Sequence, residues 1–512
     1  MYTFDWLAKQ ADLRPDKTAL IDAATGRRLT YPQFHLRAGC FADFLRREWR
    51  LEPGERIALL APNSSNYFEI LWGCAKAEVI LVCLNWRLAV PELEFIMRDA
   101  TPSALVYDPA FADAARTLAE HLGISRLMAL SANGDDRALP AGVAAYEDAL
   151  ASTSGREVVM RPRGLDETWH LLYTAGTTGR PKGVLQTFGM VFYNALNIGL
   201  AIGLTDEDVT LNLLPCFHTG GLNMYTNPTF HVGGTAIVQK AFDPAETLRL
   251  LSEEATAIFG VSAVYLFLSQ HPDFERMTFR KMRSWAAGGA PIPTSLLERY
   301  LDRGIEIQFG FGMTETGPTV FLIEKGADRS KLGSVGKPQL YVDVRIVDRE
   351  GRDLPPGERG ELLIKGPGVT PGYWQRPDIT AASIEDGWLH SGDVAVRDAD
   401  GYYTIVDRWK DMFISGGENV YPAEVENVIY QLPAVAEAAV VGVPDERWGE
   451  VGRAFVVLRP GEILDAAAVI AHCRRQIAAY KAPKLVVFID RLPRNAAGKV
   501  VKDELRRLAQ PA

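Results

Sequence analysis

Cysteine is scarce in this chain of 512 residues, and its distribution gives no sign of a metal or disulfide site. The five cysteines stand far apart in apolar or helical surroundings, and none forms a Cys-x-x-Cys pair. Zinc sites and disulfide frameworks need cysteines at characteristic spacings, so neither is predicted. Reduced thiols in a cytoplasmic protein are expected instead. The cysteines are Cys40, Cys74, Cys83, Cys216 and Cys473.

Long hydrophobic runs are also missing. The apolar run at residues 79–84 is far shorter than the roughly 20 residues that a membrane helix needs. The N-terminal segment MYTFDW contains no basic stretch followed by an apolar one, which excludes a signal peptide. We therefore expect no transmembrane segment.

The chain has no excess of positive charge: its formal net charge is −9. This balance gives no electrostatic reason to bind nucleic acid or an anionic membrane surface. An acidic average can still contain a local phosphate pocket, so only a surface that coats polyanions is excluded. No nucleic-acid partner is expected.

The chain is longer than one ordinary domain, which predicts at least two domains. Residues 17–108 and 209–285 alternate short apolar, β-rich runs with amphipathic helical stretches, which predicts mostly parallel sheets covered by helices on both faces. Within the first range, the sequence predicts a buried strand at 56–60, a helix-opening turn at 62–65 and a helix at 68–77. From about residue 340 the pattern changes to short strands and Gly/Pro turns, typical of a small antiparallel sheet or barrel. After Lys410 the remaining residues indicate a compact α+β unit.

The segment 173–183 (YTAGTTGRPKG) follows an apolar run and is rich in glycine, hydroxyl groups and cations. Glycines let the backbone approach a polyphosphate closely, threonine hydroxyls add donors, and Lys182 supplies positive charge. A Walker A loop would require glycine directly before the lysine, where Pro181 stands, so a P-loop ATPase is disfavoured. A plain surface loop is the alternative on composition alone.

Five segments, in order along the chain, resemble the signature motifs of the adenylate-forming superfamily, which contains acyl- and aryl-CoA synthetases, peptide-synthetase adenylation domains and firefly luciferase. The resemblance spans nearly the whole chain and favours the acid–CoA ligase branch, similar to fatty-acid–CoA ligases. The segments are 173–183 (YTAGTTGRPKG), 311–315 (FGMTE), 388–393 (WLHSGD), 407–419 (DRWKDMFISGGEN) and 493–499 (PRNAAGK).

The resemblance implies a fold and a reaction. The fold is a large α/β domain with mostly parallel sheets and a small β-barrel-like subdomain (residues 1–409), followed by a small mobile α+β domain (residues 410–512) that carries the catalytic lysine. In the reaction, a carboxylate attacks the α-phosphate of ATP, and pyrophosphate leaves. Cations and hydrogen-bond donors must then hold the negative charge that develops.

The resemblance also assigns roles to single residues. Lys499 would bridge the attacking carboxylate and the α-phosphate, and Glu315 and Thr174 would complete the catalytic set as Mg²⁺ ligands. Asp393 would accept from the ribose hydroxyls, and Arg408 would help to hold the ribose. The remaining residues expected to contact ATP, with Phe311 stacked on adenine and Thr314 donating to the α-phosphate, are Gly176, Thr177, Thr178, Gly179, Lys182, Gly289, Ala290, Gly310, Phe311 and Thr314.

Two positions depart from the superfamily pattern. Ala175 replaces a frequent serine and removes one hydroxyl, while Phe311 replaces a frequent tyrosine and keeps only the ring. Neither change removes a charged group, so we expect activity to be retained.

Coenzyme A is the expected acyl acceptor. The resemblance makes Lys410 the hinge about which the C-terminal domain rotates, and Gly416 and Gly417 would let the pantetheine arm pass close to the backbone. The chain ends soon after Lys499, without room for a fused carrier domain, which favours free coenzyme A. A stand-alone adenylation enzyme that serves a separate carrier protein is the alternative.

The acyl pocket is expected to be apolar and roomy. His218 matches the superfamily position that borders the carboxylate, and the adjacent Thr219 and Gly220 are small. No cation is placed to pair with a second substrate carboxylate, and Gly220 stands where hydroxycinnamate ligases tend to carry tyrosine. A medium- or long-chain fatty acid or a bulky ring acid therefore fits best. The substrate-contacting residues are predicted to be His218, Gly220, Val261, Gly288 and Gly312.

A third hypothesis is a non-catalytic ATP- or acyl-binding protein that keeps the fold. The presence of both Glu315 and Lys499 argues against it, because a binding module needs neither a metal-ligating carboxylate nor a catalytic lysine. The expected partners are thus a small carboxylic acid, ATP with Mg²⁺, and coenzyme A, and the sequence is compatible with a homodimer.

Overall fold

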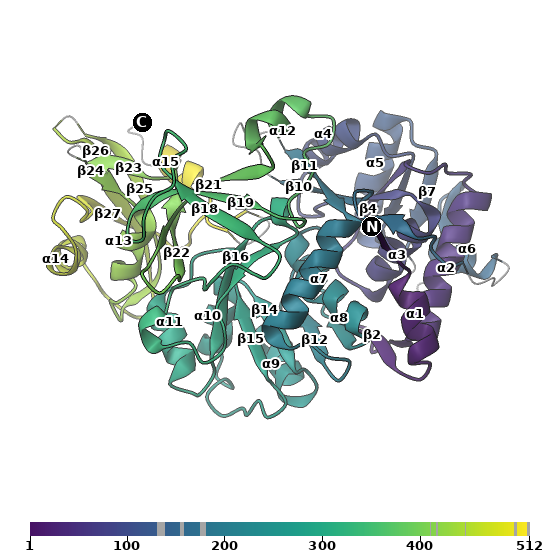
Figure 1. Ribbon diagram of the computed structural model, residues 1–512, viewed down its shortest axis with the longest axis horizontal. Coiled ribbons are helices and arrows are strands. Elements are labelled where there is room, and N and C mark those ends of the chain that lie inside the picture. The colour runs from purple at the N-terminus through teal and green to yellow at the C-terminus, as the bar shows by residue number, and fades with distance from the viewer. Residues whose placement is uncertain are drawn as a thin grey trace.

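The computed structural model describes residues 1–130, 139–153, 158–174, 181–409, 411–415, 418–445, 447–495 and 499–508. Figure 1 shows the strands of the C-terminal part, with helices α13 and α14, at one end of the molecule and helices α1 to α6 at the other. No helix within the described ranges combines the length and the apolar character that a membrane crossing requires.

A sheet of seven strands, counted over the described residues, forms the first layer of the fold, in the order β11-β10-β5-β4-β6-β7-β8. Its strands are parallel except for the β10–β11 hairpin. The central strands are buried along their whole length, as expected for a parallel sheet covered on both faces. The bounds are β4 (Arg56–Leu60), β5 (Ile80–Cys83), β6 (Ala104–Tyr107), β7 (Arg126–Ala129), β8 (Val143–Ala145), β10 (Thr168–Thr174) and β11 (Lys182–Thr187).

A second sheet, of eight strands in the described ranges, has the order β17-β16-β15-β14-β12-β13-β2-β3 and is antiparallel only at its two edges. The bounds are β2 (Thr18–Asp22), β3 (Arg28–Thr30), β12 (Val209–Asn212), β13 (Thr235–Val238), β14 (Ala257–Gly260), β15 (Ser284–Ala287), β16 (Ile307–Gly312) and β17 (Thr319–Leu322). A short pair, β1 (Tyr2–Thr3) and β9 (Arg163–Gly164), lies apart from both sheets.

Helices cover both sheets. Their bounds are α1 (Trp6–Leu13), α2 (Tyr31–Arg47), α3 (Ser65–Ala77), α4 (Val90–Ala100), α5 (Ala112–Leu122), α6 (Tyr146–Ala151), α7 (Phe188–Ile202), α8 (Thr226–Val232), α9 (Pro244–Glu253), α10 (Ser262–Gln270) and α11 (Thr294–Leu301). A π-helical turn, η2 (Gly220–Met224), precedes α8, and 3₁₀ turns occur at η1 (Pro109–Phe111), η3 (Thr314–Thr316) and η4 (Arg329–Lys331).

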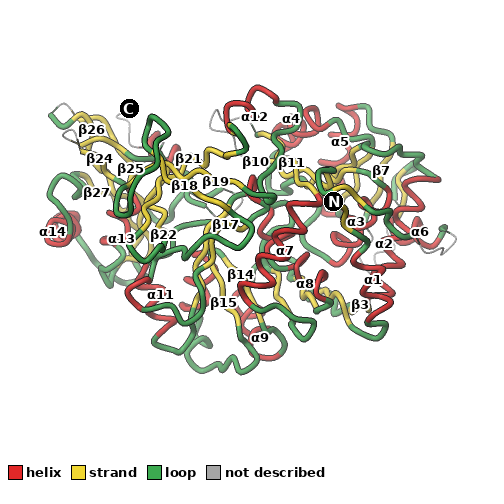
Figure 2. Tube along the Cα trace, in the orientation of Figure 1, coloured by secondary structure: helices red, strands yellow, loops and turns green. Residues whose placement is uncertain are grey.

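Two antiparallel-rich sheets follow, each of five strands within the described part of the chain. The first comprises β18 (Asp343–Val347), β19 (Arg359–Lys365), β20 (Ile384–Glu385), β21 (Trp388–Arg397) and β22 (Tyr403–Arg408), with α12 (Pro377–Ser383) beside it. The second comprises β23 (Phe413–Ser415), β24 (Glu418–Val420), β25 (Val435–Asp445), β26 (Gly449–Leu458) and β27 (Leu485–Phe488), with α13 (Pro422–Ile429), α14 (Ala466–Gln476) and α15 (Lys502–Leu508). In Figure 2 the labelled strands β18, β19, β21 and β22 lie between the N-terminal sheets and this C-terminal unit.

The predicted fold class is confirmed: two mostly parallel α/β sheets, an antiparallel sheet and an α+β C-terminal unit. Strand 56–60 has the predicted bounds. The next helix was predicted to begin at Phe68 but begins at Ser65, because the Ser64 side chain accepts a hydrogen bond from the Tyr67 backbone N–H (3.3 Å) and caps the helix there.

Candidate active site

The β10–β11 hairpin carries the predicted phosphate loop. Thr174, the last residue of β10, lies opposite Lys182, the first residue of β11. The Oγ1 atom of Thr174 is buried and has no hydrogen-bond partner among the described residues, so this hydroxyl is available to a phosphate oxygen or a metal ion. Four predicted phosphate contacts lie outside the described residues: Gly176, Thr177, Thr178 and Gly179.

Glu315 lies in the short turn η3 and is buried close to that hairpin. Its Oε1 accepts a hydrogen bond from the Tyr373 hydroxyl at 3.0 Å and lies 3.7 Å from the Nζ of Lys182. The Lys182 ammonium also sits 3.7 Å from the centre of the Tyr373 ring. Burial lowers the pKa of Lys182, and the charge of Glu315 opposes that shift. A carboxylate and a cation are thus held together beside Thr174 and the phosphate loop.

The described residues contain no group of three or more His, Cys, Asp or Glu side chains that could hold a metal by themselves. Mg²⁺ is commonly bound by one or two carboxylates together with substrate phosphates and water. Glu315 and the unpartnered Thr174 hydroxyl fit that pattern.

Asp393 and Arg408 are neighbours across strands β21 and β22. Arg408 Nε lies 3.3 Å from Asp393 Oδ1, and the Asp393 side chain is only 6% exposed whereas that of Arg408 is 49% exposed. Burial raises the pKa of Asp393 to about 6, although the nearby charges of Arg408 and Lys499 oppose the shift. The two predicted ribose contacts therefore form one ion pair in the antiparallel sheet.

Lys499 comes from the C-terminal unit but lies among charges of the N-terminal part. Its backbone N–H donates to the Asn495 side chain at 3.0 Å, and its carbonyl accepts from the Asn495 N–H at 2.8 Å, which closes the turn that carries it. Burial of its ammonium and the Arg408 charge lower the pKa of Lys499, while Asp393 and Glu315 raise it. The tertiary structure thus brings together charged groups from three motifs that are far apart in the sequence.

The raised pKa of Asp393 makes a pH dependence of ATP binding expected. The ionised carboxylate can accept from both ribose hydroxyls, whereas protonation removes acceptor capacity, so ATP affinity should rise as pH rises through about 6. We expect the KM for ATP to be about tenfold higher near pH 5 than near pH 7.5. Steady-state kinetics across this range would test it. Asp393→Asn should bind ATP weakly and without this titration, and a flat wild-type KM would contradict the expectation.

His218 lies in the loop after β12, and its ring contacts the ring of Phe217 (centroids 4.6 Å apart). Its Nε2 is buried without a hydrogen-bond partner among the described residues. Burial, followed by the charges of Lys499 and Arg87, lowers the pKa of His218 to about 3, so its imidazole is neutral at physiological pH. A neutral ring near Lys499, with one nitrogen open to a ligand, fits the predicted position beside the substrate carboxylate.

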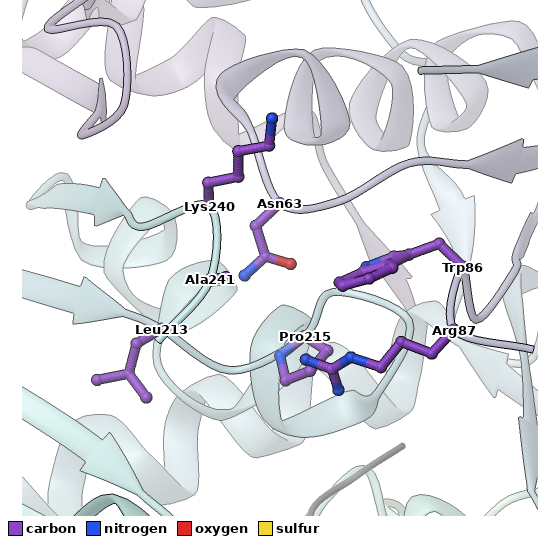
Figure 3. A pocket seen from close by; sticks show the side chains of 7 residues that line it. All are labelled: Asn63, Trp86, Arg87, Leu213, Pro215, Lys240 and Ala241. Atoms are coloured by element: carbon purple, nitrogen blue, oxygen red, sulfur yellow. The ribbon is translucent and has the colours of Figure 1, made fainter. Parts of the chain in front are cut away.

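A small polar pocket lies next to this loop, at the carboxyl ends of strands from both parallel sheets (Figure 3). The Arg87 guanidinium lies over the Trp86 ring, 4.7 Å from its centre, and over the Phe217 ring, 5.7 Å from its centre. Asn63 ties the two sheets together here, donating to the carbonyls of Leu214 (2.8 Å) and Gln239 (3.2 Å). The lining residues are Asn63, Trp86, Arg87, Leu213, Pro215, Lys240 and Ala241.

Of the predicted acyl-pocket residues, Val261, Gly288 and Gly312 lie at the carboxyl ends of β14 to β16, whereas His218 and Gly220 lie in the segment after β12. The Phe259 ring lies where a Cβ on Gly288 would meet it at 3.2 Å, and Val261 borders Gly289. Phe259, Phe309 and the predicted adenine contact Phe311 are each only partly buried, although their strands lie inside the fold. Ala290, next to Gly289, is half-buried as well. These apolar surfaces are therefore open to a ligand at this edge of the sheet.

The predicted site glycines differ in what a side chain at each position would contact. A Cβ on Gly310 would lie 2.5 Å from the Phe321 carbonyl oxygen, and one on Gly312 would lie 1.8 Å from that of Pro318, so backbone packing alone requires both glycines. Around Gly220 a Cβ would meet only the flexible Leu214 side chain, at 3.2 Å. Unlike Gly310 and Gly312, Gly220 is therefore not required by backbone packing, and its lack of a side chain leaves room in the predicted acyl pocket.

The predicted hinge Lys410 and the predicted coenzyme A contacts Gly416 and Gly417 lie outside the described residues. Beside the hinge, Asp411 pairs with Arg506 at 2.7 Å, and Asp407 accepts a hydrogen bond from the Ala423 N–H at 2.9 Å. Arg359 of β19 also lies 3.6 Å from Glu424 of α13. The Asp407–Ala423 hydrogen bond and the Arg359–Glu424 ion pair thus link the C-terminal unit to the preceding sheet, whereas the Asp411–Arg506 pair lies within the unit.

Two residues that contact the predicted metal turn were not predicted from the sequence. Tyr373 binds the Glu315 carboxylate, and the Gln186 side chain donates to the carbonyl of Thr314 at 2.8 Å. Both lie outside the motifs that resemble the superfamily. A single aromatic and a single amide carry no local pattern, so only their tertiary contacts identify them.

The model of the family described as "AMP-binding enzyme" matches residues 7–374, which is more than half of the chain. The chain belongs to this family. A second model, described as "AMP-binding enzyme C-terminal domain", matches residues 424–499 of the same AMP-binding enzyme.

Curated relatives of this AMP-binding enzyme are acid–CoA ligases. It is 41% identical over 503 residues to a feruloyl-CoA synthase of an Amycolatopsis species, covering 98% of each chain. It is 37% identical to an indoleacetate–CoA ligase of Aromatoleum aromaticum, covering 98% of this chain and 97% of that one. It is 35% identical to the long-chain-fatty-acid–CoA ligase FadD13 of Mycobacterium tuberculosis, covering 99% and 98%. The predicted enzyme class, an AMP-forming acyl-CoA synthetase, is confirmed.

Solved structures agree with the fold of the AMP-binding enzyme. ATP-bound MatB from Rhodopseudomonas palustris superposes with a TM-score of 0.90 at 33% identity, covering 98% of each chain. The o-succinylbenzoate coenzyme A synthetase MenE from Bacillus subtilis, in complex with ATP and a magnesium ion, superposes with a TM-score of 0.86 at 31% identity, covering 99% of this chain and 100% of that one. The enzyme is thus an ATP-binding, adenylate-forming protein.

Proposed function

We propose that this AMP-binding enzyme activates a hydrophobic carboxylic acid with ATP and Mg²⁺ and transfers the acyl group to coenzyme A. One observation carries the proposal: Lys499 of the C-terminal unit lies within electrostatic range of Glu315, Asp393 and Arg408 of the N-terminal part. These groups belong to separate sequence motifs, and the chemistry of adenylate formation needs them together.

In the first step, a carboxylate oxygen of the acid attacks the α-phosphorus of ATP, the bond to the β-phosphate oxygen breaks, and pyrophosphate leaves. Lys499 would lie between the incoming carboxylate and the α-phosphate and offset their charge. Lys182 and Thr174 would contact the departing phosphates, and Asp393 with Arg408 would hold the ribose. Glu315 and Thr174 would hold Mg²⁺, which lowers the charge on the phosphate oxygens when bound.

In the second step, the coenzyme A sulfur attacks the acyl carbon of the mixed anhydride. The carbon–oxygen bond to AMP breaks, a thioester and AMP form, and the thiol proton is released. Lys499 would occupy the site of the first step, so the C-terminal domain (residues 410–512) would rotate against residues 1–409 about Lys410 to admit the thiol. Gly416 and Gly417 would then border the pantetheine arm.

A medium- or long-chain fatty acid or a bulky ring acid fits the acyl site. Its walls include the partly exposed rings of Phe259 and Phe309 and the apolar Val261, and Gly220 leaves room beside His218. Relatives named for ferulate and indoleacetate, both ring acids, support testing ring acids first.

The free, buried thiols of all five cysteines support a reducing compartment such as the cytoplasm.

The test is release of pyrophosphate and AMP with ATP, Mg²⁺ and a panel of aromatic, indolic, alicyclic and fatty acids, each with and without coenzyme A. We expect turnover with at least one hydrophobic acid, and its rate should depend on coenzyme A. A single burst of pyrophosphate that coenzyme A does not convert into turnover would favour the carrier-protein alternative. ATP binding without pyrophosphate release with any acid would contradict the ligase.

A further inference from the structure

A chain of buried amides connects the predicted metal turn with the acyl side of the enzyme. The Gln186 side chain donates to the Thr314 carbonyl at 2.8 Å, directly before Glu315. Its oxygen accepts from the Asn223 side chain at 3.3 Å. Asn223 lies in the π-helical turn η2, which follows His218 by only a few residues, and neither amide side chain is exposed.

The hairpin register explains why Gln186 reaches the turn. On β11, Lys182 and Gln186 lie on the same face because side chains alternate along a strand, and they pair across the hairpin with Thr174 and His170. Lys182 approaches the Glu315 carboxylate, and Gln186 holds the carbonyl of the preceding residue. Strand β11 thus contacts the Glu315 turn through two side chains, Lys182 and Gln186.

The other side of the turn is fixed as well. The Thr370 N–H donates to the Glu315 carbonyl at 2.8 Å, and the Thr370 hydroxyl donates to the Leu185 carbonyl of β11 at 2.7 Å. Without Gln186 the part-buried Thr314 carbonyl loses its side-chain donor, and the free-energy cost of leaving this acceptor unpaired favours a shift of the turn toward another partner. The direction of the Glu315 side chain would move with it.

Asn223 has more acceptors than hydrogens. Its amide nitrogen carries two hydrogens but lies 3.2 Å from the Thr219 hydroxyl and 3.3 Å from both Gln186 Oε1 and His170 Nε2. A shift of η2 would therefore change which of these three acceptors Asn223 bonds, and so whether the Asn223–Gln186 hydrogen bond is kept. The Asn227 side chain donates to the Asn223 oxygen at 3.0 Å and anchors the other end of the amide.

We propose that Gln186, oriented by Asn223, is a positioning residue that sets the metal-binding geometry of the Glu315 turn and links it to the acyl-side helical turn. This rests on the proposed role of Glu315 as a Mg²⁺ ligand. Neither Gln186 nor Asn223 touches the nucleotide in this assignment, so both act through Glu315.

The test is calorimetric titration of the full-length enzyme with α,β-methylene-ATP, once with millimolar Mg²⁺ and once with EDTA. Gln186→Met keeps the side-chain length and removes both hydrogen bonds. We expect the Mg²⁺-dependent gain in affinity to shrink about tenfold, with the affinity in EDTA unchanged within about twofold. Asn223→Leu should reduce the gain in the same direction by about threefold, although it lies on the acyl side.

Gln10→Met is the matched control, because the Gln10 side chain also donates to a backbone carbonyl, that of His231, at 2.8 Å but lies far from the turn in sequence and belongs to α1. It should leave both affinities unchanged. If Gln186→Met fails to fold, Gln186→Leu, which likewise has no donor for the Thr314 carbonyl, should show the same loss.

The Glu315→Gln variant distinguishes the proposed metal role of Glu315 from the proposed positioning role of Gln186. If this variant keeps the full Mg²⁺-dependent gain, the proposed metal role is wrong. If Glu315→Gln loses the gain while folded Gln186→Met or Gln186→Leu keeps it, the positioning role is overturned and the metal role stands. Equal weakening with Mg²⁺ and with EDTA would also overturn it, since a merely structural defect has no reason to depend on the metal.

Discussion

Replacing Lys499 by alanine should lower the rate of acyl-adenylate formation by about 10²–10³-fold, the usual cost of removing one preorganised charge-stabilising group. Burial and the charge of Arg408 lower the pKa of Lys499, and the charges of Asp393 and Glu315 oppose that shift, so its ammonium lies among the charged groups of the predicted ATP site. Without it, the carboxylate and the phosphate approach each other uncompensated. Pyrophosphate release in single-turnover experiments would measure the loss.

The second half-reaction distinguishes this role from a general defect. When preformed acyl-adenylate and coenzyme A are supplied, the Lys499→Ala variant should form the thioester within a few-fold of the wild-type rate. Lys484→Ala is the matched control, because Lys484 is an exposed lysine of the same C-terminal unit, packed over the Trp448 ring. It should leave both steps unchanged. Equal loss of both steps in Lys499→Ala would contradict the assigned role.

Glu315→Gln should lower adenylate formation by about 10²-fold and remove most of its dependence on Mg²⁺. Glutamine keeps the shape and can still accept from the Tyr373 hydroxyl, but it carries no charge for the metal or for the nearby Lys182 ammonium. The rate of pyrophosphate release as a function of Mg²⁺ concentration is the measurement. Excess Mg²⁺ should not restore the rate.

Glu324→Gln provides the control for this substitution. Glu324 is exposed and, like Glu315, accepts a hydrogen bond from a tyrosine, Tyr402, in the same region of the sequence. It should keep the wild-type rate and Mg²⁺ dependence. A Glu315→Gln variant that responds to Mg²⁺ as the wild type does would remove Glu315 from the metal site.

The sequence alone determined the family, the fold class and the order of the charged motifs. Local patterns carry this information, because strand and helix periodicity are properties of neighbouring residues, and the motifs are short, continuous segments. The buried strand at 56–60 was therefore placed correctly. The helix-opening turn at 62–65 is predicted, but the helix is predicted to start at Phe68 instead of Ser65, since a serine cap depends on one side-chain hydrogen bond rather than on periodicity.

Only the tertiary structure decided which residues meet. Tyr373 reaches Glu315 across 58 residues, and Gln186 reaches Thr314 across 128, through strand pairings that no local pattern specifies. The same holds for the glycines: a Cβ on Gly312 would clash with the Pro318 carbonyl, whereas one on Gly220 would meet only the flexible Leu214 side chain. Contacts between distant segments follow from sheet order and register, which arise only when the whole chain packs. The motifs thus indicate which chemistry the residues can perform, and the packing of distant segments brings those residues together in one site.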